Sequence, residues 1–157
     1  MPMGQRRGSI PRSHYQPGEH IGMDSIVNLP PDIHGYQHVL VIVDHFTRWT
    51  ELTPIKTLEA EEACQVILDY ITRYGTPQNI TSDNGTQFIN SSVGNLIALL
   101  NIEPIPILPY NHQENGIVEN RNRIIRRLLT ACQKGSEKDY LQACALARRV
   151  LNSPQQV

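Results

Sequence analysis

Three acidic residues of this chain stand where carboxylates could do chemistry. Asp83 precedes an Asn-Gly pair, Glu119 follows another, and residues 84–118 separate the two acids. Asp24 interrupts an apolar stretch, where an unpaired acid is costly unless it has a use. Carboxylate oxygens suit Mg²⁺ or Mn²⁺, with water and substrate phosphate completing the coordination shell. Two such ions about 4 Å apart would support in-line phosphoryl displacement on nucleic acid without a covalent nucleophile.

Chance is the competing explanation for this trio. The chain has 15 Asp and Glu residues, which allow many accidental groups of three, and most acids are solvated surface residues. Placement favours the metal site over chance. Asp24 lies inside a predicted strand, Asp83 lies between a predicted strand and a turn, and Glu119 shares a predicted helix face with Arg123 and Arg126.

The elements that must position these acids follow from the hydrophobic pattern. The continuous apolar run at residues 39–43 is typical of a strand covered on both faces. Three early strands with short links predict an antiparallel meander. A following helix, for which Thr57 is the expected N-cap, would act as the crossover that brings the Asp83 strand beside the Asp24 strand. We expect strands at 20–28, 38–46, 49–54, 78–82 and 103–107, helices at 58–74, 87–100, 118–134 and 138–152, and a polar loop at 108–116.

The order of these elements predicts an α/β fold with a five-stranded mixed sheet flanked by helices. A length of 157 residues suits one domain with a substantial core. We expect a flexible N-terminal arm or linker at 1–18, a core domain at 19–152 and a truncated C-terminal tail at 153–157. No apolar run approaches the ~18 residues of a membrane span, so no membrane association is predicted.

Composition places the chain among ordinary globular proteins. The three cysteines are scattered and the six histidines lack zinc spacing, which favours a reducing compartment over a disulfide framework. The formal net charge of −1 is unlike that of a typical nucleic-acid binder. Local basic surface can still arise, because the arginines concentrate within 121–127 while acids gather at 59–62.

Four ordered motifs make the sequence resemble the catalytic core of retroviral and LTR-retrotransposon integrases, especially the gypsy-like group. The resemblance covers roughly residues 18–152, and its ordered motifs make it far more specific than any single one. The matching pieces are Gly22–Asp24, Val39–Trp49, Ser82–Phe88 and Gln113–Arg123.

The resemblance implies an RNase H-like fold and a metal-dependent polynucleotidyl transferase. Asp24, Asp83 and Glu119 match the family's catalytic, metal-binding triad for two Mg²⁺ or Mn²⁺ ions. The family trims the 3′ ends of element DNA and then joins them to target DNA. Its members act as homo-oligomers, dimers or higher, in the nucleus after cytoplasmic assembly of the element particle, and they need no organic cofactor.

Six further residues are candidate DNA contacts: Asn84, His112, Gln113, Asn115, Arg123 and Arg126. Each also has an ordinary structural explanation, as a turn, a polar loop or an exposed helix face. The sequence departs from the gypsy-like pattern at Asn111, His112 and Asn120, which affects the expected DNA contacts. Asp44 lies in a matching motif but is expected to serve as a turn acid, and Trp49 is expected to pack.

The flanking domains typical of the family are missing from this sequence, so we expect an excised core with partial activity. Two competing functions remain open. One is a related RNase H-like nuclease that hydrolyses DNA without joining strands. The other is a domesticated integrase-derived module that binds DNA or protein without full integration activity, an alternative that the near-zero net charge keeps open.

Overall fold

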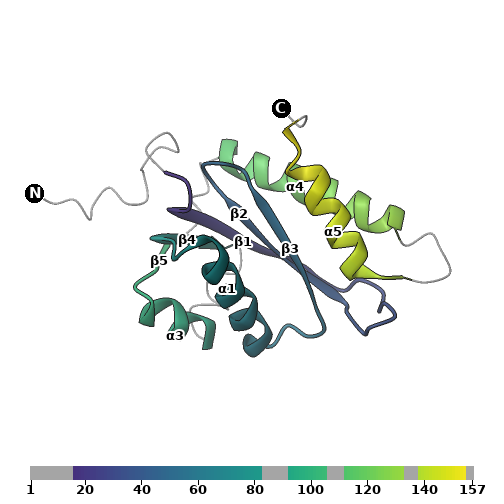
Figure 1. The fold of residues 1–157 in the computed structure, drawn as a ribbon, viewed down its shortest axis with the longest axis horizontal. Helices are drawn as coiled ribbons and strands as arrows, with labels where there is room; N and C mark the ends of the chain where they lie inside the picture. The colour runs from purple at the N-terminus through teal and green to yellow at the C-terminus, as the bar shows by residue number, and fades with distance from the viewer. Residues whose placement is uncertain (1–15, 83–91, 106–111, 133–137, 155–157) are drawn as a thin grey trace, which may run out of the picture.

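The computed structural model describes residues 16–82, 92–105, 112–132 and 138–154, with the side chains of 112–119 and 132 outside that description (Figure 1). These residues form a five-stranded sheet in the order β3-β2-β1-β4-β5. The strands are β1 (His20–Ile26), β2 (His38–Asp44), β3 (Thr50–Ile55), β4 (Asn79–Ser82) and β5 (Glu103–Ile105). The helices in the described ranges are α1 (Ala60–Tyr74), α3 (Ser92–Leu99), α4 (His112–Cys132) and α5 (Tyr140–Leu151).

The sheet is mixed, as the sequence predicts. β1, β2 and β3 form an antiparallel meander, whereas β4 runs parallel to β1 and β5 runs parallel to β4. Every residue of β2 is buried, which confirms the prediction of a central strand covered on both faces. The expected α/β fold, a five-stranded mixed sheet flanked by helices, is therefore confirmed.

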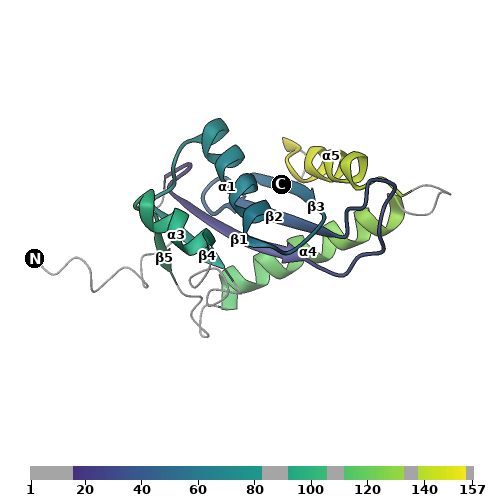
Figure 2. The same ribbon diagram turned by 90° about the horizontal axis from the view of Figure 1, so that it is seen from below.

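Helices cover both faces of this sheet. α1 and α3 pack on one side, where Ile67 of α1 and Val93 of α3 join the core formed with Ile21 and Met23 of β1. α4 runs across the opposite face (Figure 2), where Ile125 and Leu129 are fully buried against residues of β2 and β3. Successive residues of β1 therefore serve opposite faces, and Asp24 belongs to the α4 side.

The starts of α4 and α1 differ from the sequence predictions. α4 begins at His112, so the prediction of a polar loop through residue 116 is wrong for 112–116. An interior Gly116 destabilises a helix by only about 1 kcal/mol, which the packing of a long helix can offset. Thr57 is not the N-cap of α1, because the helix starts after Glu59. Instead, the backbone N–H and hydroxyl of Thr57 donate to the Glu62 carboxylate.

The start of α5 is held by a buried acid from a distant loop. Asp32 accepts hydrogen bonds from the backbone N–H groups of Tyr140, Tyr36 and His34, at 2.8, 2.8 and 2.9 Å. Burial alone would raise the pKa of Asp32, but the three donors outweigh it and the pKa lies below its usual value. The carboxylate thus supplies the helix start with a buried negative charge.

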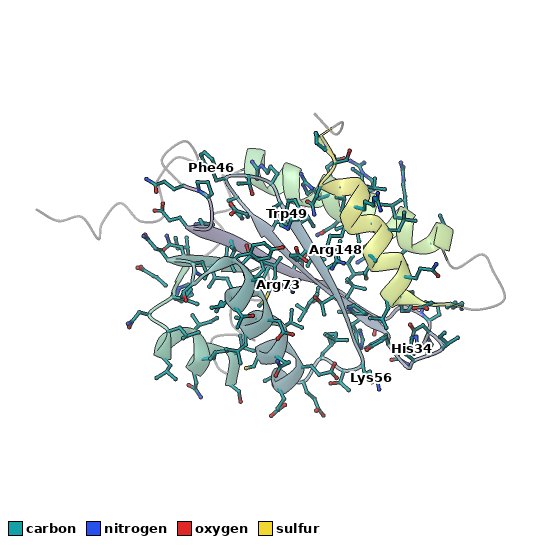
Figure 3. The ribbon with its side chains drawn as sticks, in the orientation of Figure 1. His34, Phe46, Trp49, Lys56, Arg73 and Arg148 are labelled. Atoms are coloured by element: carbon teal, nitrogen blue, oxygen red, sulfur yellow. The ribbon has the colours of Figure 1, made fainter. Side chains whose placement is uncertain are left out.

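A second buried acid links α1 to α5 around the edge strand β3. Glu51 is 4% exposed, and its carboxylate accepts from Trp49 Nε1 at 2.7 Å and from the Tyr74 hydroxyl at 2.5 Å. Arg148 of α5 and Arg73 of α1 lie 3.5 and 3.7 Å from its other oxygen. Figure 3 shows Trp49, Arg73 and Arg148 gathered around β3. Within the described ranges, no helix is both long and apolar enough to cross a membrane.

Candidate active site

Asp24 is the one member of the predicted triad whose side chain is described. It lies in β1 and is half-buried on the α4 side of the sheet. Oδ1 accepts from the backbone N–H of Ser25 at 2.8 Å, and Oδ2 accepts from Asn122 Nδ2 at 2.5 Å. These two donors fix the carboxylate's orientation and leave its remaining lone pairs for other ligands.

The pairing of β1 with β4 brings into register the residues that precede the two predicted acids. Met23, the residue before Asp24, pairs with Ser82, the residue before Asp83, in two parallel strands. Adjacent strands lie about 4.8 Å apart. Asp83 itself lies outside the described residues, as does its neighbour Asn84. The sequence prediction that the strand ending at Ser82 lies beside the Asp24 strand is confirmed.

α4 carries the third predicted acid. Glu119 is the eighth residue of this helix, so the expectation that it occupies the first turn is wrong, because the helix begins at His112. The side chain of Glu119 lies outside the described set. Asn122 follows Glu119 by three positions and contacts Asp24, so the helix segment that contains Glu119 is tied directly to β1.

The next polar contact of α4 reaches a different strand. Arg121 donates from a terminal guanidinium nitrogen to the hydroxyl oxygen of Thr50 at 2.9 Å. Thr50 is fully buried at the start of β3. Its hydroxyl donates to the Arg48 carbonyl at 3.1 Å. The Asn152 side chain at the end of α5 pairs with both backbone groups of Thr50 at 2.8 Å. Burial lowers the pKa of the Arg121 guanidinium.

Two histidines pack against the strands next to Asp24. The His20 ring hydrogen-bonds through Nε2 to the Thr81 hydroxyl at 2.7 Å, which joins β1 to β4. The His45 ring lies 4.3 Å from the His20 ring, centroid to centroid. A Cβ at Gly22 would come within 2.6 Å of His45 Nε2. The absence of a side chain at Gly22 is therefore what admits His45 beside β1.

All predicted DNA-contact residues within the described ranges lie in α4. Arg123 and Arg126 are exposed on α4, and Arg123 donates to the Asn120 side chain at 2.6 Å. His112, Gln113 and Asn115 lie in the first turns of α4 rather than in a loop, with their side chains outside the description. Both described arginines are thus available to solvent on the helix that contacts Asp24.

Asp44 has the structural role predicted from the sequence. Its carboxylate accepts from the backbone N–H groups of Gly18, Phe46 and Thr47, at 2.6, 2.8 and 3.2 Å. A carboxylate that accepts successive N–H groups in this way organises a turn. The expectation that Asp44 is a turn acid is therefore confirmed.

The described part of the site fits a divalent cation through Asp24. Its oxygen atoms are hard donors of the kind that Mg²⁺ and Mn²⁺ prefer, and they are held by Ser25 and Asn122. No group of three His, Cys, Asp or Glu residues able to hold a metal occurs among the described side chains. Asp83 and the Glu119 side chain are not in that set.

Sequence reasoning missed the contacts that position α4. Asn122 was recognised only as part of a motif, although its i+3 spacing from Glu119 placed both on one helix face. The Arg121–Thr50 contact joins residues 71 positions apart. No local pattern indicates such a long-range contact, because it depends on how α4 crosses the sheet.

Comparison with known proteins relates the chain to retroviral integrases. Residues 14–112 match a family model described as integrase core domain. The Gag-Pol polyprotein of feline leukemia virus is 34% identical over 142 residues, covering 88% of this chain and 8% of that protein. The Pol polyprotein of Radiation murine leukemia virus (strain Kaplan) is 34% identical over 143 residues, covering 89% of this chain and 24% of that protein. The chain thus spans a small part of these relatives.

Solved structures share the fold over most of the chain. The catalytic core domain of BIV integrase superposes with a TM-score of 0.70 at 28% identity, covering 87% of this chain and 85% of that one. The HTLV-2 integrase catalytic core domain in complex with magnesium, in a dimeric form, gives 0.68 at 22% identity and covers 88% of both chains. A simian T-cell lymphotropic virus intasome gives 0.71 at 24% identity, covering 93% of this chain and 54% of that chain. The expected RNase H-like fold is confirmed.

Proposed function

Since the chain belongs to the integrase core domain family, we propose that it is a metal-dependent polynucleotidyl transferase that processes the 3′ ends of element DNA and joins them to target DNA. The observation that carries this proposal is the Asn122–Asp24 hydrogen bond. It ties the helix that contains Glu119 to a strand acid, beside the strand that leads into Asp83.

In this proposal Asp24, Asp83 and Glu119 hold two Mg²⁺ or Mn²⁺ ions. Such ions activate the attacking oxygen and stabilise the leaving one in phosphoryl transfer. Asn122 and the Ser25 N–H orient the Asp24 carboxylate, so that it need not reorganise when it binds a ligand. The magnesium complex of the HTLV-2 core supports this choice of cation.

DNA would be held along α4. Arg123 and Arg126 are exposed on that helix and can contact phosphate oxygens. Asn84, His112, Gln113 and Asn115 are proposed as further contacts. Phosphate contacts of this type make binding weaken steeply as salt concentration rises, so a local basic surface can serve despite the overall charge of −1.

We also propose that the chain acts as a homo-oligomer on DNA in the nucleus. The HTLV-2 core is known in dimeric and trimeric forms, and the simian T-cell lymphotropic virus protein occurs in an intasome. Light scattering of the purified chain with and without branched DNA measures its mass directly. A monomer under both conditions would contradict the oligomer.

The catalytic proposal is tested on two DNA substrates, a branched strand-transfer product and a blunt duplex, with Mg²⁺ or Mn²⁺. Wild type, Asp24→Asn and Glu119→Gln are compared, with a chelator as control. We expect cleavage or joining by the wild type and a loss of at least 100-fold in both variants. Activity that survives both substitutions would refute the catalytic assignment.

The same experiment separates the alternatives. Hydrolysis without joining on any substrate would indicate a nuclease of the same fold. Equal DNA binding by all three proteins, with no reaction, would indicate a domesticated binding module. The gypsy-like subgroup stays a prediction, since the relatives described above are retroviral.

A further inference from the structure

Two consecutive residues of α4 are anchored on strands that are not neighbours. Asn122 donates to Asp24 on β1, while Arg121 donates to Thr50 on β3. β2 lies between those strands, so the two anchor points are separated by two strand spacings, roughly 10 Å. The contact to β1 is made by the short amide of Asn122, and the contact to β3 by the longer side chain of Arg121.

Consecutive helix positions point about 100° apart around the axis. A single polar contact restricts the rotation of a packed helix less tightly than two polar contacts that point in different directions. Side-chain ends lie about 5–6 Å from a helix axis, so a roll of roughly 10° moves them by about 1 Å. Metal and catalytic groups tolerate only about 0.5 Å of displacement. The rotation of α4 therefore decides whether its side chains can reach a site on β1.

The Thr50 hydroxyl is a prepared acceptor for Arg121. Its own proton is directed to the Arg48 carbonyl, so its lone pairs are left for the guanidinium. The backbone of Thr50 is fixed independently by the Asn152 side chain. Among the described residues, no carboxylate lies within ion-pair distance of Arg121. The half-buried guanidinium donates instead to the neutral hydroxyl of Thr50.

We propose that Arg121 and Thr50 form a rotational anchor that positions α4, and through it Asn122 and Glu119, for metal binding at Asp24. The proposal rests on the proposed metal-dependent function. Arg121 is a positioning residue in this scheme and does not touch metal or DNA. Without the anchor, the buried Ile125 and Leu129 still hold the helix to the sheet, but the rotation of its Glu119–Asn122 segment is set less precisely, which weakens metal binding.

The test uses two readouts on the full chain. The first is the Mn²⁺ or Mg²⁺ concentration that gives half of the maximal rise in melting temperature. The second, measured without metal, is hydrogen exchange of the backbone amides at 117–122. We expect Arg121→Met and Thr50→Val each to raise the half-maximal metal concentration about 10-fold. This is near the lower end of the loss seen when a residue that orients a metal ligand is removed. Both variants should also exchange the amide hydrogens of 117–122 faster.

Matched variants separate positioning from folding. Thr50→Ser keeps the hydroxyl and is expected to stay within twofold of the wild type. Arg127→Met removes an exposed arginine from the same helix and is expected to leave both readouts unchanged. The Arg121→Met/Thr50→Val double variant should be no worse than the poorer single variant, because the two residues act through one contact. Additive losses, or a Thr50→Val protein identical to wild type, would overturn the anchor.

Asp24→Asn distinguishes this inference from the function on which it rests. If metal stabilises the wild type and Asp24→Asn abolishes that effect, unchanged metal dependence in Arg121→Met refutes the anchor alone. If metal does not stabilise the wild type, the metal function fails. Hydrogen exchange at 117–122 then tests the anchor by itself. Faster exchange in Arg121→Met than in Arg127→Met would support the anchor, and equal rates would refute it.

Discussion

Replacing Glu51 by Gln is expected to loosen the attachment of α1 and α5 to β3. The carboxylate is almost completely buried, and it binds Trp49 and Tyr74 through short hydrogen bonds. Glutamine keeps the size and one oxygen, which can still face these two donors. Its amide group then faces Arg148 and Arg73, where it offers a donor in place of an acceptor.

The size of the effect follows from how each partner is placed. Hydrogen bonds to charged groups contribute about 1.5–3 kcal/mol each, and an amide oxygen keeps roughly half of that for Trp49 and Tyr74. The side chains of Arg73 and Arg148 are 49% and 38% exposed, so solvent screening limits each ion pair to about 1 kcal/mol or less. Together these losses give about 2–5 kcal/mol. Melting temperature should fall by about 4–20 °C in a chain of this length.

Urea unfolding of Glu51→Gln, followed by the fluorescence of Trp49, measures this loss. Trp49 is the only tryptophan, and its indole nitrogen contacts the altered group, so circular dichroism should be recorded in parallel. Glu61→Gln, an exposed acid on α1, is the control and should change the unfolding free energy by less than about 1 kcal/mol.

Spectroscopic titration of Tyr74 gives an independent check. Burial and the hydrogen bond to Glu51 raise the pKa of this phenol, so the pKa should fall toward its usual value in Glu51→Gln. The reasoning is refuted if Glu51→Gln is as stable as Glu61→Gln and tyrosine ionisation is unchanged.

Three further predictions concern the site and the start of α5. Asn122→Ala should raise the metal concentration for half-maximal stabilisation by about 10–100-fold, because Asp24 loses its orienting donor; an unchanged titration would contradict this. Gly22→Ala should destabilise the fold by about 1–3 kcal/mol through the clash with His45, and His45→Ala in the same chain should recover most of that in urea unfolding. Asp32 has a pKa below its unfolded value, so its stabilisation is present above about pH 4 and is lost as pH falls through the folded pKa. Asp32→Asn should accordingly unfold more easily at pH 7 and lose less stability on acidification, and parallel pH profiles of the two proteins would refute the assignment.

Local patterns in the sequence were sufficient to predict the sheet. The apolar run in β2 indicated burial on both faces. The helix predicted at 58–74 ends at Tyr74 as expected, and Gly75 follows it with a φ of 92°. Asp44 was predicted as a turn acid because it follows a strand directly. These features depend on neighbours close in sequence, so residue type and spacing are enough to indicate them.

Contacts between distant segments were harder to predict. The start of α4 was placed too late because Asn115 and Gly116 are poor helix formers, a preference that tertiary packing overrides. Arg121 was taken as part of a basic cluster, whereas it is half-buried against Thr50. Both errors arise because the crossing of α4 over the sheet decides which of its side chains are enclosed.

The Asn152–Thr50 pair has a consequence for aggregation. β3 is an edge strand, and edge strands can recruit strands from other molecules. Along a strand, the backbone N–H and C=O groups of every second residue point to the same side. The backbone groups of Leu52 and Pro54 therefore point away from β2, as those of Thr50 do. Asn152 occupies both groups of Thr50, and Pro54 has no N–H, so this edge offers an incoming strand at most one donor.

The opposite edge is protected in a similar way. β5 is only three residues long and has Pro104 at its centre, and proline in an edge strand blocks further pairing. Within the described residues, neither edge of the sheet therefore invites extension by another chain. Association between copies of this protein should therefore proceed through side-chain surfaces rather than through a continuous intermolecular sheet.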